Sequence, residues 1–228
     1  MQEHYSDPKG FVVLGLPRSG TTFLCKTLDQ FDNVSFPAEY EPFRVNIDIN
    51  RVVDSLTNNR YMGFKTFPFY HLDILDIISN YNLFVIGVLR KDIWKSIGSL
   101  LPAIENSDNF NPSSKPIKYC YNHSRLEEYF IVNTVHRYLT NIDFIEKNFH
   151  QNVIYYEDFV NQDYSNDVLN TFFNRQITIR TDYDDSHHPS QYFVDFEPVK
   201  KLVLDHLDKN IITYEKIPSW ALDNLYNV

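Results

Sequence analysis

A segment near the N-terminus combines residue types and spacing suited to binding an anion. It reads Gly15-Leu-Pro-Arg-Ser-Gly-Thr-Thr22 and overlaps the end of an apolar run at residues 11–16. Glycines let backbone amides approach an anion closely, and a helix that starts after the loop adds the positive end of its dipole. A strand, this loop and a helix from about Gly20 therefore predict a phosphate-binding loop of P-loop type. An ordinary strand-to-helix turn is the alternative.

The loop departs from those of nucleotide-hydrolysing proteins. In those proteins a Lys follows the second Gly, and the next Ser or Thr binds magnesium. Here Thr21 occupies the Lys position, and the basic residue of the loop is Arg18. The apolar run 83–89 leads into Arg90, where a magnesium-organising strand would end in Asp. We therefore expect an anion site that needs no metal ion.

The loop resembles the 5'-phosphosulfate loop of the PAPS-dependent sulfotransferases, which reads Pro-Lys/Arg-Ser-Gly-Thr-Thr. Residues 17–22 match it throughout, and the resemblance continues in order to about residue 160. The protein-tyrosine and bacterial branches, which use Arg in this loop, are more similar than the cytosolic phenol and steroid enzymes. The resemblance implies 3'-phosphoadenylyl sulfate (PAPS) as donor, adenosine 3',5'-bisphosphate as product and no metal. It assigns cofactor contacts to Arg18, Ser19, Gly20, Thr21 and Thr22.

Further cofactor contacts are implied by segments that follow two of the expected strands. Arg90 resembles the strand-end Arg that binds the 3'-phosphate in the family, and Ser99 resembles the Ser that joins it from the next helix. The spacing is one residue longer than in the commonest version. Ser96, three residues earlier on the same helical face, is therefore an alternative to Ser99.

Two more residues are connected with the cofactor by resemblance. The segment Val153-Ile-Tyr-Tyr-Glu-Asp-Phe159 resembles the Tyr-Glu-Asp-Leu segment of the family, so Tyr156 is expected on the adenine side of the cofactor. A core tyrosine at a strand end is the other interpretation. The Arg-Lys-Gly loop of the cytosolic members is missing, and Ser186 is a looser candidate for its place.

Two residues are candidates for the chemical step, together with Arg18. Glu39 aligns with the catalytic Glu of related enzymes and would accept the acceptor's proton, with Glu41 as the alternative base. Either could instead be a solvated loop carboxylate. Lys65 resembles the Lys that contacts the sulfate and the bridging oxygen in the family. A Lys inside an apolar strand is costly to bury unpaired, although an edge-strand Lys can also extend to solvent.

Strands and helices, which are indicated by two different periodicities of apolar residues, would position these candidates. Short apolar runs alternate with segments of helical period, which predicts an α/β fold with a P-loop-type parallel β-sheet flanked by helices on both faces. A single domain is expected, with the cofactor-binding core at about residues 10–160 and a helical and loop portion at 161–228. The strands are predicted at 11–16, 62–67, 83–89 and 153–156, and the helices at 20–31, 70–81, 92–101, 124–149 and 197–207.

Local signals add detail to these elements. Ser124 and Glu127 form a capping box that predicts where the helix at 124–149 begins. Residues 105–118 and 181–191 show little periodicity and are interpreted as surface loops, the first near the mouth of the site.

Composition limits the class of partner. The chain has 228 residues, 43% of them hydrophobic, which is enough for one sizeable core. Its net charge of −9 argues against a polyanionic partner such as nucleic acid. Two cysteines predict no disulfide framework and favour a reducing compartment. No leader or membrane-spanning run is evident, so we expect a soluble, cytoplasmic chain, unless an N-terminal anchor was removed.

The sequence thus predicts an enzyme that transfers the sulfuryl group of PAPS in line to a hydroxyl or amine. The acceptor could be a small molecule, a carbohydrate or a peptide, because the loops contain no readable motif. Two other classes stay open, a P-loop kinase and a non-catalytic nucleotide-binding module. The kinase should carry the Lys and the strand-end Asp that this loop lacks.

Overall fold

The computed structural model describes residues 8–36, 61–68, 73–105, 119–120, 127–160, 164–179, 193–195, 197–209 and 217–226. Contacts divide the chain into two compact units. Unit 1 comprises Met1–Leu89 and Phe144–Asp182, and unit 2 comprises Arg90–Asp143 and Tyr183–Val228. The expectation of one domain over the whole chain stays a prediction.

A parallel sheet of four strands forms the centre of unit 1. Its order is β2-β1-β3-β5, with β1 at Gly10–Gly15, β2 at Gly63–Thr66, β3 at Leu83–Leu89 and β5 at Val153–Tyr155. Every residue of β1 and β2 is buried, as expected for strands that are covered on both faces. The chain is therefore an α/β protein with a parallel sheet, as the sequence predicted.

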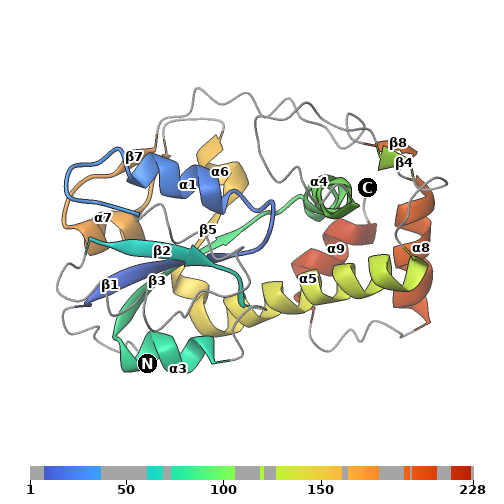
Figure 1. Ribbon diagram of the computed structural model, residues 1–228, viewed down its shortest axis with the longest axis horizontal. Coiled ribbons are helices and arrows are strands. Elements are labelled where there is room, and N and C mark those ends of the chain that lie inside the picture. Colours follow the sequence, from blue (N-terminus) through green and yellow to red (C-terminus); the bar gives the residue numbers. More distant parts are fainter. Residues whose placement is uncertain are drawn as a thin grey trace. The chain divides into compact units, whose positions relative to one another are not determined.

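One face of the sheet is covered by α1 (Thr21–Leu28), α6 (Tyr156–Val160) and α7 (Asp167–Phe173), as Figure 1 shows. Alternate strand residues, among them Phe11 and Val13, join one core cluster with side chains of these three helices. The cluster is rich in aromatic rings. Phe172, for example, stacks on Phe84 at 4.2 Å between ring centroids.

The other face is covered by α3 (Ile74–Asn80) and by the C-terminal end of α5 (Glu128–Phe149), seen below the sheet in Figure 1. A Cβ atom on Gly87 of β3 would lie 3.1 Å from Ile145 of α5, so the helix packs close to this strand. Helices on both faces were predicted from the alternation of strand and helix patterns. An antiparallel pair, β6 (Tyr164–Ser165) with β7 (Thr178–Ile179), completes unit 1.

Unit 2 is built mainly from helices. It contains α4 (Ile93–Glu105), α8 (Glu197–Asp208) and α9 (Ser219–Tyr226), together with the parallel pair of β4 (Tyr119–Cys120) and β8 (Phe193–Asp195). α9 is attached to α4 by two hydrogen bonds, from the Ile93 amide to Asn224 Oδ1 at 3.1 Å and from Trp94 Nε1 to the Leu225 carbonyl at 3.1 Å. Unit 2 therefore fixes the helix that directly follows β3 in the chain.

Several predicted boundaries differ from the structure. α4 continues through Pro102 to Glu105, beyond the predicted end at residue 101. Leu101 and Pro102 are buried, and this packing outweighs the local cost of the proline. α5 begins at Glu128, because the Glu127 carbonyl accepts its first hydrogen bonds from Phe130 and Ile131. The predicted start at Ser124 was wrong, since Glu127 precedes the first turn of the helix instead of lying within it.

None of the helices in the described ranges has the length and apolar character that crossing a membrane requires.

Candidate anion site

The loop between β1 and α1 closes on itself through Ser19. The Ser19 hydroxyl donates to the Leu16 carbonyl at 2.8 Å and accepts from the Leu16 amide at 3.1 Å. The Ser19 amide also donates to the Leu16 carbonyl, at 3.1 Å. Ser19 is fully buried. It is therefore engaged within the loop, where it holds the turn at residues 16–19, and its expected contact with the cofactor stays a prediction.

Two residues of the loop have left-handed backbone angles. Arg18 has φ of 66° and Gly20 has φ of 91°. Glycine adopts this region freely, but a residue with a side chain is held there at a cost of about 1–3 kcal/mol. The alternation turns the backbone sharply at the carboxyl end of β1 and leads it directly into α1.

Gly15 allows the loop to fold back over the end of its own strand. A Cβ atom at this position would lie 2.3 Å from Thr21 Cγ2 and 2.9 Å from the Val88 carbonyl oxygen of the neighbouring strand β3. Both distances are shorter than real contacts of a Cβ atom, so only glycine fits. Gly15 is thus required by its close contacts, and Gly20 is favoured by its left-handed backbone.

The N-terminus of α1 is open. Among the described residues no side chain caps it, and its first turn contains no acidic residue. Leu24 is the first residue whose amide bonds back to the loop, at 3.0 Å from the Gly20 carbonyl. The amides of Thr21 and Thr22 come before it. The positive end of the helix dipole and these early amides form the environment that stabilises an anion.

Lys65 brings a cation to the same helix end. It lies on β2 opposite Val13 of β1, is buried with 6% of its surface exposed, and donates from Nζ to Thr22 Oγ1 at 2.8 Å. A cation beside the positive end of a helix is electrostatically unfavourable, and both features favour a negative charge between them. The predicted pair of loop and Lys65 is therefore brought together in unit 1.

Lys65 contacts Thr22, a position that has another role in nucleotide-hydrolysing proteins. Thr22 stands where the magnesium-binding Ser or Thr of a P-loop stands, and Thr21, which stands where the P-loop Lys would be, is buried. An ammonium group donates to the Thr22 hydroxyl here. Two positive charges at one hydroxyl would repel each other, so this arrangement favours an anion neutralised by Lys65 over an anion carried with magnesium.

Arg90 is the first residue after β3. β1 and β3 are neighbours, β2 lies beyond β1 and β5 lies beyond β3, so the strand order reverses between β1 and β3. Ligands of open parallel sheets bind outside the carboxyl ends of the strands at such a reversal. The loop follows β1, which is one of these two strands. Arg90 comes after the other strand in the sequence and belongs to unit 2, so its expected contact with the 3'-phosphate stays a prediction. Arg90 is buried.

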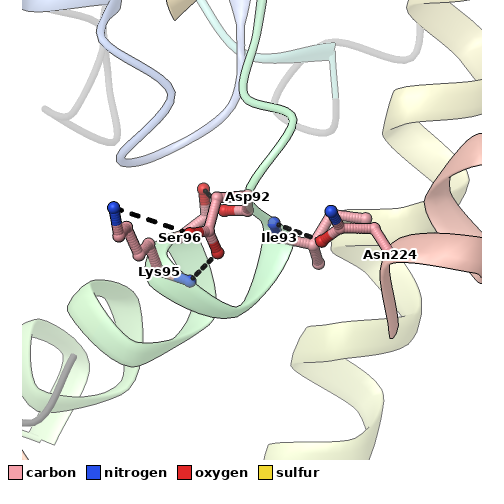
Figure 2. Close-up of polar contacts among 5 residues, drawn as sticks. All are labelled: Asp92, Ile93, Lys95, Ser96 and Asn224. Carbon is pink, nitrogen blue, oxygen red and sulfur yellow. Dashed lines mark hydrogen bonds and ion pairs between the residues drawn. The ribbon is translucent and has the colours of Figure 1, made fainter. Parts of the chain in front are cut away.

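The helix after Arg90 has a closed N-terminus, which Figure 2 shows. Asp92 Oδ1 accepts the Lys95 amide at 2.8 Å, and Asn224 Oδ1 accepts the Ile93 amide at 3.1 Å. Lys95 Nζ lies 3.7 Å from Asp92 Oδ2. Two amides at the start of α4, those of Ile93 and Lys95, are thus satisfied by side chains, and the Asp92 carboxylate beside them disfavours an anion there.

The two serine candidates on α4 differ in their surroundings. Ser96 is fully buried, and its hydroxyl donates to the Asp92 carbonyl at 3.3 Å (Figure 2). Ser99 is half-buried. A hydroxyl that is already bonded within its own helix has less to offer a ligand, which favours Ser99 of the two.

Tyr156 is the first residue of α6 rather than the last residue of a strand. Its side chain is buried within the core cluster, and its ring packs against Gly20 of the loop. The neighbouring Tyr155 donates from its hydroxyl to Glu146 at 2.7 Å. Burial, followed by Glu146, raises the pKa of Tyr155 well above its usual range. The expected contact of Tyr156 with adenine stays a prediction.

Three predicted site residues lie outside the described residues. These are Glu39 and Glu41, the alternative bases, and Ser186. Within the described ranges no group of three or more His, Cys, Asp or Glu side chains comes together.

Sequence reasoning missed Asp92 and Asn224 at the start of α4, and it missed the contact of Tyr156 with Gly20. Asp92 precedes an apolar run and is a favoured N-cap residue, so local pattern could have identified it. Asn224 lies 131 residues from Ile93, and Tyr156 lies far along the chain from Gly20, so no local signal connects either pair.

Comparison with protein-family models and with curated proteins finds no match to this chain.

Proposed function

We propose that this protein is a sulfotransferase that moves the sulfuryl group of PAPS to a hydroxyl or amine acceptor. The observation that carries the proposal is the hydrogen bond of 2.8 Å from Lys65 Nζ to Thr22 Oγ1 at the open start of α1. It puts a fixed cation where a nucleotide-hydrolysing loop holds its metal. A singly charged sulfuryl group on a phosphate can be neutralised by such a cation and by the helix amides.

In the proposed reaction the acceptor oxygen or nitrogen forms a bond to sulfur, while the bond from sulfur to the 5'-phosphate oxygen breaks. Negative charge grows on that departing oxygen, and Lys65 and the amides of Thr21 and Thr22 are suited to stabilise it. The proton of the acceptor passes to a base, for which Glu39 or Glu41 is the candidate. Arg90 and Ser99 would hold the 3'-phosphate, a role that the resemblance implies.

A ligand-binding panel tests the proposal. Thermal unfolding is measured with adenosine 3',5'-bisphosphate in EDTA and with ATP in the presence and absence of magnesium. The bisphosphate should stabilise the protein without metal, by about 2.7 kcal/mol at a concentration 100 times its dissociation constant. No stabilisation by millimolar bisphosphate, together with binding of ATP and magnesium, would overturn the proposal in favour of a kinase.

Transfer is then measured with PAPS labelled in the sulfuryl group and a panel of sugars, phenols and tyrosine peptides. A labelled acceptor product is expected for one of these classes. If the bisphosphate binds but neither transfer nor slow hydrolysis of PAPS is detected, the non-catalytic binding module is the better description.

A further inference from the structure

The loop between β1 and α1 is in contact with an aromatic ring of another element. A Cβ atom on Gly20 would lie 2.2 Å from Tyr156 Cδ2 and 3.0 Å from Cε2, so the edge of the ring touches the backbone of the loop. Tyr156 keeps only 5% of its surface exposed. It follows β5 directly and opens α6, which places it at the carboxyl ends of the strands, where the loop also lies.

The Tyr156 ring packs against a second ring, which in turn stacks on a third. Tyr156 meets Phe159 edge to face at 5.5 Å between centroids, and Phe159 stacks on Phe23 at 5.7 Å. Phe159 is fully buried, and Phe23 belongs to the first turn of α1. α6 thus supports the loop at two points, at Gly20 through Tyr156 and at the start of α1 through Phe159.

Such support is needed because the loop conformation is not one that the chain adopts by itself. Arg18 is left-handed, and a residue with a side chain persists in this region only where its surroundings fix it. The hydrogen bonds of Ser19 fix residues 16–19. The next residue, Gly20, is of the type with the most permissive backbone, and the Tyr156 ring limits where it can move.

We infer that Tyr156 is a positioning residue, whose ring keeps the loop in its anion-binding conformation before any ligand arrives. This inference deepens the proposed function, on which it rests for the identity of the anion. It implies that Tyr156 affects the affinity for every anion that binds to the loop amides, with or without an adenine ring. A contact with adenine would affect only adenine-containing ligands.

The test compares Tyr156→Leu with Phe172→Leu. Phe172 belongs to the same core cluster, but it packs on Phe84 and Phe11, each the second residue of its strand, at the opposite ends of the strands from the loop. Both variants remove a buried ring, so both should lose stability. Tyr156→Phe retains the ring and serves as the conservative variant.

The first measurement is hydrogen exchange of the Leu16, Ser19 and Leu24 amides, which are hydrogen-bonded within the loop or to it, in the ligand-free protein. Tyr156→Leu should accelerate this exchange about tenfold or more relative to Phe172→Leu, when the two variants are compared at the same free energy of global unfolding. In Tyr156→Phe the exchange rate should stay within about twofold of the wild type. Equal exchange at these amides in the two leucine variants would mean that Tyr156 has only a general structural role, which overturns the inference. Tyr156→Met keeps most of the apolar volume and replaces Tyr156→Leu if the latter does not fold.

The second measurement is the affinity for inorganic pyrophosphate and for adenosine 3',5'-bisphosphate. Tyr156→Leu should weaken both by a similar factor of about 10 to 100, whereas Phe172→Leu should weaken neither. Loss of affinity for the bisphosphate alone would make Tyr156 an adenine contact and overturn the inference. If the wild type binds neither anion, the proposed function fails, while the exchange measurement still decides the role of Tyr156.

Discussion

Two helices of this protein start directly after neighbouring parallel strands, and their N-termini are completed in opposite ways. The start of α1 after β1 has no side-chain cap among the described residues and no acid in its first turn, and it receives the Lys65 ammonium. The start of α4 after β3 is closed by the Asp92 carboxylate and by Asn224. The same local architecture can therefore leave the amides of a helix available to a ligand or use them within the fold.

The difference lies in where the compensating charge comes from. At α4 the carboxylate is part of the chain, so the helix dipole is stabilised in the folded protein itself. At α1 the described contacts bring a second positive group instead, which favours the binding of an anion there. An open start of a helix costs stability that a bound anion can restore, which is the expected difference between a site and a structural cap.

The largest effect is expected from making the start of α1 resemble that of α4. Thr22→Asp would place a carboxylate beside the Lys65 ammonium, in the first turn of the helix. Repulsion of the ligand should weaken the affinity for adenosine 3',5'-bisphosphate by at least about 100-fold, while the folded protein stays as stable or gains about 0.3–1 kcal/mol. Calorimetric titration and urea unfolding measure the two effects, and Thr22→Ser is the control. Binding as tight as in the wild type would show that the anion does not approach Thr22.

The two lysines next to the two helix starts provide the second test. Lys65→Met should cost about 1.5–3 kcal/mol of binding free energy for the bisphosphate, because a hydrogen bond to a charged group is lost. Turnover should fall by about 100- to 1,000-fold, as for other electrostatic stabilisers. Lys95→Met, beside the Asp92 carboxylate at the closed start, should leave both quantities unchanged. Equal losses in the two variants would point to a general effect of net charge.

Substitution of the serines of α4 should have a smaller effect on the affinity for the bisphosphate. Ser99→Ala should cost about 1.5 kcal/mol of affinity for the bisphosphate but leave the affinity for adenosine 5'-phosphate unchanged, because only the 3'-phosphate loses a partner. Ser96→Ala should change neither affinity, since its hydroxyl already donates to the Asp92 carbonyl. A loss confined to Ser96→Ala would reverse this assignment.

The smallest effect is expected at the closed helix start. Asp92→Ala removes the carboxylate that accepts the Lys95 amide and should lower the free energy of unfolding by about 1 kcal/mol. It should not change the affinity of the loop for pyrophosphate. Asp92→Asn retains the acceptor oxygen and should stay close to the wild type in urea unfolding. A stability of Asp92→Ala equal to that of the wild type would mean that Asn224 alone is sufficient to cap α4.

Much of unit 1 could be predicted because its signals are local. The apolar runs of β1, β2 and β3 and the loop glycines each lie within one short segment, and all three strands were located to within a few residues. The short helices α6, α7 and α9 were not predicted. Five to eight residues give too little periodic pattern, and these helices are stabilised by packing, as Phe172 and Phe173 of α7 are in the aromatic core.

The sequence by itself determined that a strand, a glycine loop with Arg18 and a helix follow one another, because backbone sterics and apolar periodicity act between near neighbours. Only the tertiary structure decided which distant residues complete that loop. Lys65 reaches Thr22 across 43 residues because β2 pairs with β1 in the register that sets Lys65 beside Val13. Tyr156 reaches Gly20 because β5 ends at the same edge of the sheet as β1. Strand register and helix packing depend on the whole fold, so contacts of this kind are not written in any local pattern.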